Sequence, residues 1–179
     1  MTSNKCLTGT DRLFEAANKI DSNIIINVQG DEPLIDSKDV IKCYELKKAH
    51  PDAVINAFSY LSEGEDPFNV NIPKVILNEK DELIYMSRSK IPGQKDEQIT
   101  QPNYLKQVCI YGFDKSQLEK FYNFKRKSYL EKYEDIEILR FFELGIRIKM
   151  FKASKTSIAV DIPEDIIKVE NEFQKLNLK

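Results

Sequence analysis

The sequence predicts an α/β fold in which helices flank a mixed, mostly parallel sheet. Helical and strand-like patterns alternate from the N-terminus to Tyr60, which is the rhythm of an α/β sheet. The apolar run Asn23–Val28 has no polar alternation at its centre, as is typical of a parallel strand buried on both faces. The 179 residues contain no internal repeat, low-complexity segment or clear linker, so we expect one domain over 1–179.

The first part of the chain contains two helix–strand pairs. A helix is predicted over Asp11–Ile20, because its apolar residues recur at helical spacing, with Thr10 as the candidate N-cap. The strand Asn23–Val28 follows it. A second helix is predicted after Ser37, and a second apolar strand over Ala53–Tyr60.

The middle of the chain combines a hairpin, a long loop and further helices. Two strand-like segments around a polar turn predict the hairpin, and the polar stretch Arg88–Asn103 is predicted as a loop. Loops of this length are often functional. The predicted hairpin strands are Lys74–Leu77 and Glu82–Ser87, the next strand is Tyr104–Phe113, and the next helices are Lys115–Asn123 and Tyr133–Glu143.

The last part contains two short strands and a terminal helix. Gly145 is a candidate helix C-cap, and the alternating segment Ile146–Phe151 after it predicts a strand. A short strand is predicted over Ser157–Val160, and Pro163 suits the first position of the final helix. The apolar stripe of that helix is Ile166, Val169, Phe173 and Leu176.

Composition excludes several classes of protein. The chain has 27 Lys and Arg against 29 Asp and Glu, so it lacks the positive surface that nucleic-acid binding requires. No apolar run approaches the roughly 20 residues of a membrane span. The 3 cysteines form no C-x-x-C pair, which indicates a reducing compartment. The first residues have no apolar signal-peptide core, so the cytoplasm is the expected location.

The strongest local signal is the segment Gln29–Pro33, Gln-Gly-Asp-Glu-Pro, at the carboxyl end of a buried strand. Ligands of open α/β sheets bind outside such strand ends, and Gly30 allows the backbone to approach a ligand closely. Asp31 is then placed to hold Mg²⁺ beside phosphate oxygens, since Mg²⁺ takes only one or two protein carboxylates. The alternative is a strand-ending turn whose Asp caps backbone groups, and the motif alone leaves both interpretations open.

A second carboxylate, Asp161, follows another β-branched segment and precedes a helix. It can share a metal with Asp31, because residues far apart in sequence meet at the same sheet edge. The alternative is that Asp161 only caps the helix that starts near Pro163.

Three further features can carry binding chemistry. The segment Thr8–Arg12 offers hydroxyls, a glycine and a guanidinium at a helix start, as a cradle for a base or phosphate, although ordinary capping explains it equally well. Arg88 can clamp a substrate carboxylate or be a solvated surface residue. Tyr111 can present its hydroxyl to a sugar or lie in the core. No glycine-rich phosphate loop is present.

These pieces resemble, in order along nearly the whole chain, the bacterial CMP-Kdo synthetases, the 3-deoxy-manno-octulosonate cytidylyltransferases. The segment Asn27–Pro33 is the most specific match. The other matching pieces are Met1-Thr2, Thr8–Leu13, Tyr85–Arg88 with Ile91-Pro92, Ile110–Gly112, Leu130-Glu131, Glu137–Arg140, Val160-Asp161 and Pro163–Asp165.

The resemblance implies a nucleotidyltransferase-type, Rossmann-like fold and an activity that couples CTP to the acid sugar Kdo for lipopolysaccharide biosynthesis, releasing pyrophosphate. It implies Mg²⁺ as cofactor and a homodimer whose pairing and sugar-binding segment covers about 104–140. The implied roles are metal binding for Asp31 and Asp161, nucleotide binding for Thr8, Arg12, Gln29 and Gly30, and sugar binding for Arg88, Gln107, Tyr111 and Glu131.

Three departures from the family pattern leave alternatives open. The strand and basic loop with which family members begin have no counterpart here, so we expect the chain to lack that N-terminal segment. Gln107 stands where the family has a histidine, and Ile162 replaces a threonine. The alternatives are a cytidylyltransferase for a sialic-acid-type sugar or amino-Kdo, or a non-catalytic dimerisation module.

Overall fold

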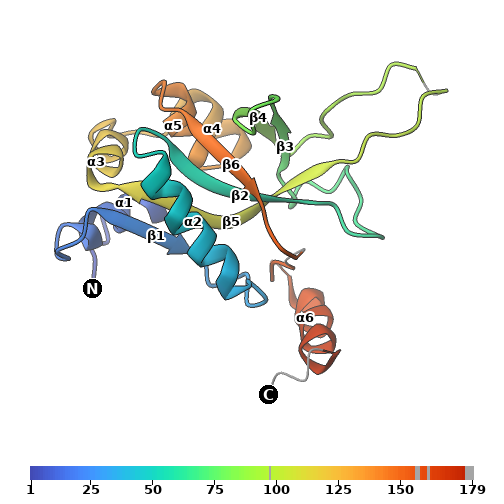
Figure 1. The fold of residues 1–179 in the computed structure, drawn as a ribbon, viewed down its shortest axis with the longest axis horizontal. Coiled ribbons are helices and arrows are strands. Elements are labelled where there is room, and N and C mark those ends of the chain that lie inside the picture. The colour runs from blue at the N-terminus through green and yellow to red at the C-terminus, as the bar shows by residue number, and fades with distance from the viewer. Residues whose placement is uncertain (97, 156–157, 161, 176–179) are drawn as a thin grey trace.

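The computed structural model describes residues 1–96, 98–155, 158–160 and 162–175. These residues form a six-stranded sheet with helices on both faces (Figure 1). The helices are α1 Gly9–Ala17, α2 Ser37–Ala49, α3 Lys115–Asn123, α4 Tyr129–Glu134, α5 Ile138–Glu143 and α6 Pro163–Lys175. The strands are β1 Ile24–Val28, β2 Val54–Tyr60, β3 Lys74–Leu77, β4 Leu83–Ser87, β5 Leu105–Asp114 and β6 Ile148–Lys152.

The long strand β5 organises the sheet. The strand order is β4-β3-β5-β2-β6, and β1 also pairs with β5. Among the described strands only β2 and β6 pair in parallel, whereas the β1, β2 and β3 ladders to β5 and the β3–β4 hairpin are antiparallel. A mixed sheet is therefore confirmed, but the prediction that it is mostly parallel is wrong. Strands β1 and β2 do run in the same direction, but β5 lies between them.

Strand β1 is less buried than its sequence predicts. Ile25 is buried, Ile24 and Ile26 are half-buried, and Val28 is 41% exposed. Within the described residues β1 pairs with β5 alone, so its other edge carries no ladder. An apolar run reports a preference for burial, but it does not report how many neighbours a strand has.

Two apolar layers hold the helices on the sheet. On one face α2 packs through Cys43 and Leu46 against buried residues of β2 and β5. On the other face α1, α3 and α5 pack around three phenylalanine rings, where Phe141 stacks on Phe113 and meets Phe121 at a tilt. No helix of the described part is long and apolar enough to cross a membrane. In Figure 1, α6 follows the end of β6 and stands apart from the helices that cover the sheet.

Several element boundaries differ from the prediction. Helix α1 starts at Gly9, and its N-cap is Thr8 rather than Thr10, because the Thr8 hydroxyl accepts the Asp11 N–H. The single helix predicted over Tyr133–Glu143 is two helices, α4 and α5, divided where Asp135 takes a left-handed conformation at φ 50°. Short polar side chains tolerate that conformation.

Other predictions are confirmed. The hairpin, the loop after Arg88, the limits of α3 and the Pro163 start of α6 are as predicted, and Gly145 lies just beyond α5 at φ 70°. The segment 158–160 is not a strand, and Ser157 lies outside the described residues. In the predicted stripe of α6, Val169 is buried and Ile166 is exposed, whereas Leu176 is not described.

Gly112 is required where α2 crosses β5. A Cβ built on Gly112 would lie 3.1 Å from Cys43 Sγ and 3.3 Å from Ile55 Cβ. We expect Gly112→Ala to lower the free energy of unfolding by about 1–3 kcal/mol, because overpacking a filled core forces its neighbours apart. Urea unfolding measures the change. Gly93→Ala is the matched control, since its Cβ would meet no atom within 4 Å, and equal stability losses in both variants would contradict this account.

Candidate functional site

The Gln-Gly-Asp-Glu-Pro segment forms a tight turn at the carboxyl end of β1. The Gln29 N–H donates to the Cys109 carbonyl of β5 at 3.2 Å, and the Glu32 N–H donates back to the Gln29 carbonyl at 3.3 Å. This bond places Gly30 and Asp31 at the two central positions of a β-turn. Asp31 is exposed, and Glu32 is buried. The turn therefore directs one carboxylate outward and the next one inward.

The segment that precedes Asp161 lies against this turn. The Val160 N–H donates to the Asp31 carbonyl at 2.8 Å, although 129 residues separate the two. Asp161 itself lies outside the described residues. The segment that ends at Val160 thus meets the turn that carries Asp31, as expected for segments that end at one sheet edge.

The donor chemistry at Asp31 suits a hard cation. Its carboxylate is exposed and has no hydrogen bond or ion pair among the described residues. Mg²⁺ needs only one or two carboxylates, with water and substrate oxygens completing its shell. Within the part of the chain that is described, no three His, Cys, Asp or Glu side chains gather as a metal cluster.

A narrow pocket lies beside this turn and joins residues of both predicted binding groups. Gln29, predicted to bind the nucleotide, and Tyr111, predicted to bind the sugar, line it together with Thr10. The other lining residues are Asn27, Phe113, Glu137, Ile138 and Phe141. Burial raises the pKa of the Tyr111 hydroxyl well above its usual value, and the nearby Cys109 thiol adds to the effect. Tyr111 is 9% exposed and its ring stacks on Phe113, so it lies at the edge of the core, the alternative that the sequence left open.

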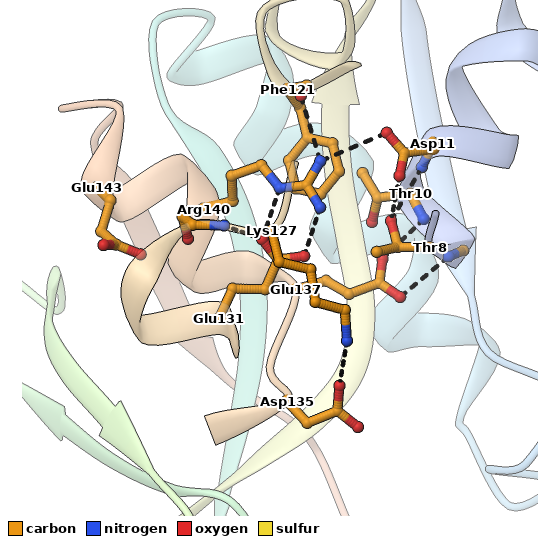
Figure 2. A network of polar contacts seen from close by, with 12 residues as sticks. Thr8, Thr10, Asp11, Phe121, Lys127, Glu131, Asp135, Glu137, Arg140 and Glu143 are labelled. Carbon is orange, nitrogen blue, oxygen red and sulfur yellow. Dashed lines mark hydrogen bonds and ion pairs between the residues drawn. The ribbon is translucent and has the colours of Figure 1, made fainter. Parts of the chain in front are cut away.

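The Thr8–Arg12 segment is held by Glu137, the residue just before α5 (Figure 2). The Gly9 and Thr10 N–H groups donate to the two carboxylate oxygens of Glu137, at 3.0 and 2.7 Å. The helix N-terminus thus already holds an anion, the arrangement that the helix dipole favours. The segment is thus a capped helix start, as the capping interpretation of Thr8–Arg12 predicted. The sequence gave no sign of the role of Glu137, because its contact with Thr10 spans 127 residues.

Arg12 points toward the start of the chain. Its guanidinium donates to the Thr2 hydroxyl at 3.2 Å and to the Ser3 carbonyl at 2.9 Å. Arg12 itself is exposed, so these contacts leave it open to a ligand on its outer side.

Glu131 is buried in an ion pair with Arg140 (Figure 2). The Arg140 guanidinium donates to both Glu131 oxygens, lies 3.4 Å from Asp11 Oδ1 and stacks 3.7 Å from the Phe121 ring centroid. Arg140 is 0% and Glu131 is 1% exposed, so the predicted contact of Glu131 with a sugar is not open in this arrangement. The cluster joins α1, α3, α4 and α5.

Arg88 also has its guanidinium engaged within the protein. It donates to the carbonyl oxygens of Val70, Glu134 and Asp135. This contact fastens the start of the long loop to the turn between α4 and α5. The predicted role as a carboxylate clamp would require Arg88 to leave these carbonyl groups.

The carboxylate of Glu134 also holds the start of the long loop. It accepts hydrogen bonds from the Tyr85 and Ser87 hydroxyls, at 3.0 and 2.7 Å, and from the Arg88 N–H at 2.8 Å. Burial raises the pKa of the Glu134 carboxyl, but these donors need the ionised form and outweigh burial, so the net shift is downward from 4.5.

This shift predicts a pH dependence of stability. A carboxyl with a lowered folded-state pKa stabilises the fold above its unfolded value of 4.5, and this contribution is lost as the pH falls through the folded-state pKa. We expect Glu134→Gln to unfold at lower urea concentration than the parent at neutral pH, and the difference to shrink below pH 4.5. A constant difference at every pH would show that the charge of Glu134 does not act as stated.

Gln107 lies on β5 beside an irregularity of the sheet. Its amide donates to Asn56 Oδ1 at 3.1 Å. The Asn56 amide in turn donates to the carbonyl oxygens of Val108 and Ile110, where the register of β2 and β5 shifts. Bulges are common next to functional sites, because they redirect side chains. Sequence reasoning missed Asn56, and a buried Asn within an apolar strand was the available signal.

Comparisons with known proteins agree on one family. The family profile described as cytidylyltransferase matches residues 1–148. The 3-deoxy-manno-octulosonate cytidylyltransferase of Leptospira interrogans is 37% identical over 98% of this chain and 70% of its own length. That of Christiangramia forsetii is 37% identical over 89% of this chain and 65% of its own length. The chain thus spans about two thirds of the length of these relatives.

Solved structures give the same fold. The structure of CMP:2-keto-3-deoxy-manno-octonic acid synthetase complexed with CTP superposes with a TM-score of 0.85 at 32% identity, over 98% of this chain and 71% of that chain. The inositol-1-phosphate CTP transferase of T. maritima has a TM-score of 0.63 at 19% identity, over 97% of this chain and 64% of that chain, and supports the fold alone.

Proposed function

Because this chain belongs to the family of 3-deoxy-manno-octulosonate cytidylyltransferases, we propose that it transfers CMP from CTP to Kdo. In this reaction the anomeric hydroxyl oxygen of the sugar forms a bond to the α-phosphorus of CTP. The bond from that phosphorus to the bridging oxygen of the β-phosphate breaks, pyrophosphate leaves, and the hydroxyl proton passes to solvent. Such transfers depend on positioning and charge neutralisation rather than on a covalent nucleophile.

The observation that carries the proposal is the outward-facing Asp31 on the turn after β1. We propose Asp31 and Asp161 as the residues that would hold Mg²⁺; the support is that Val160, the residue before Asp161 in the sequence, donates its N–H to the Asp31 carbonyl. A bound Mg²⁺ supplies positive charge against the phosphate oxygens. Asp31 thereby fixes where the α-phosphate lies relative to β1.

Residues on and around this turn are proposed to position the reacting groups. Gln29 and Gly30 would contact the nucleotide, with Thr8 and Arg12 on the adjacent segment. The Tyr111 hydroxyl would donate to the sugar from the wall of the narrow pocket beside this turn. Gln107 would approach the sugar from β5.

Arg88 and Glu131 are proposed to act indirectly. Each is engaged by neighbouring helices, so they would hold the walls of the sugar site rather than contact the sugar. This assignment departs from the family-based expectation, and the contacts described above are its support.

The experiment that tests the function is pyrophosphate release from CTP in the presence of Mg²⁺ and each of three sugars. We expect release with Kdo and little with a sialic acid or amino-Kdo. A preference for one of the other sugars would favour the alternative cytidylyltransferase, in which Gln107 in place of histidine changes the choice of sugar. Tight self-association without release for any sugar would favour a non-catalytic dimerisation module.

We also propose that the protein is a cytoplasmic homodimer that serves lipopolysaccharide biosynthesis. The adjacent rings of Tyr129 and Tyr133 on α4, 69% and 70% exposed and tilted against each other, support a pairing surface in the 104–140 region. Sedimentation velocity of the parent and of Tyr133→Ser tests this, with a shift toward monomer expected for the variant.

A further inference from the structure

The Glu32 carboxylate accepts a hydrogen bond that a main-chain carbonyl would accept in a regular sheet. The paired ladder of β1 and β5 ends at Val28 opposite Ile110. One residue further, the Gln29 N–H still bonds to the Cys109 carbonyl. The Cys109 N–H, which in a continued antiparallel ladder would bond to the Gln29 carbonyl, donates instead to the Glu32 carboxylate. The Gln29 carbonyl is thereby released to accept the Glu32 N–H that closes the turn.

This exchange ends β1 at a defined residue. Glu32 is 5% exposed, and burying a carboxylate is costly unless donors satisfy it. The Glu32 N–H bonds to the Gln29 carbonyl, and the Glu32 carboxylate accepts the Cys109 N–H. Gly30 and Asp31, which lie between Gln29 and Glu32 in the sequence, must therefore leave the sheet. Asp31 becomes exposed as a direct consequence.

The anchor for Glu32 is itself fixed from the other side. Where β2 and β5 shift register, the Asn56 amide satisfies the carbonyl groups of Val108 and Ile110, the two neighbours of Cys109. The Cys109 N–H therefore projects from a strand segment held on both edges. A carboxylate bound there is held more tightly than one on a free loop.

We propose that Glu32 is the positioning residue that aims Asp31 at the divalent cation, by replacing the Gln29 carbonyl as acceptor of the Cys109 N–H. The inference rests on the proposed function, because it takes Asp31 as a metal ligand. Glu32 does not contact the cation but fixes the backbone on which Asp31 stands. The Val160 N–H, bonded to the Asp31 carbonyl, is held in place by the same turn.

The test is Mn²⁺ binding followed by NMR, which needs no turnover. Mn²⁺ broadens the amide signals of nearby residues, so titration gives an apparent dissociation constant from the Gly30 and Val160 amides. We expect Glu32→Ala to weaken binding about 10-fold or more, since loss of a group that orients a ligand costs 10–100-fold in metal affinity. Glu32→Gln retains an acceptor oxygen and is expected to stay within about threefold of the parent.

Two controls separate this inference from the proposed function. Asp31→Asn removes the ligand itself, and Glu79→Gln changes an exposed carboxylate in the β3–β4 turn. Binding lost in Asp31→Asn but unchanged in Glu32→Ala would overturn the role of Glu32 and leave the proposed function standing. No localised broadening in the parent would overturn the metal site and, with it, the role of Glu32.

A measurement on the parent alone guards against an unfolded Glu32→Ala variant. The Cys109 amide lies beyond the paired ladder, so without the Glu32 carboxylate it would exchange with solvent rapidly. We expect its hydrogen exchange to be as slow as that of Ile110. Fast exchange at Cys109 with slow exchange at Ile110 would overturn the proposal.

Discussion

Replacing Arg140 with methionine is expected to lower the free energy of unfolding by about 3–5 kcal/mol, since it leaves two buried carboxylates without their partner. Arg140 is 0% exposed and faces Asp11 on α1 and Glu131 on α4. Its removal also takes away one of the contacts that join α1 to α4 and α5. Urea or thermal unfolding of the parent and the variant measures the loss.

Arg147→Met is the matched control for this prediction. Arg147 also pairs with two carboxylates, Asp52 and Glu82, but it is 40% exposed in its side chain. Exposed pairs contribute about 0–1 kcal/mol. Neutralising the acids in the triple variant Arg140→Met, Asp11→Asn, Glu131→Gln should recover part of the loss. Similar losses in the two single arginine variants would contradict the account of the buried cluster.

Asp31→Asn is expected to reduce pyrophosphate release by about 100-fold or more, because a metal ligand contributes several kcal/mol of transition-state stabilisation and each 1.36 kcal/mol is tenfold. The variant should keep the stability of the parent, since the Asp31 side chain is exposed and has no partner among the described residues. Initial rates over a range of Mg²⁺ concentrations measure the effect.

Asp21→Asn serves as the control for Asp31→Asn. Asp21 is exposed in the turn before β1, and its side chain makes no hydrogen bond or ion pair among the described residues. We expect its rate to match that of the parent. A similar rate for Asp31→Asn and the parent, with both folded, would remove Asp31 from the metal site.

Local patterns predicted the elements well, but the sheet only in part. The hairpin and α3 carry their own turn and capping residues, so their limits could be predicted from neighbouring positions. The direction of the ladders depends on β5, which lies far along the chain from β1 and β2, and no local pattern encodes it. The break at Asp135 was missed because the apolar periodicity of α4 continues into α5.

For the candidate site, the sequence predicted where β1 ends but not the residues that hold the turn after it. Gln29 and Asp31 follow a strand directly, so their position at the sheet edge could be predicted. The contacts of Glu32 with Cys109 and of Glu137 with α1 span 77 and 127 residues, beyond any spacing rule. Glu131 is predicted to face a sugar, but its carboxylate instead accepts hydrogen bonds from the buried Arg140 of the next helix.

The measurement that tests the central claim most directly is ³¹P NMR of this protein with CTP, Kdo and Mg²⁺. The account predicts a new phosphodiester resonance for CMP-Kdo and an equal amount of pyrophosphate, both dependent on Kdo and on Mg²⁺. Unchanged CTP in the presence of the folded protein, or pyrophosphate formed equally without Kdo, would contradict it.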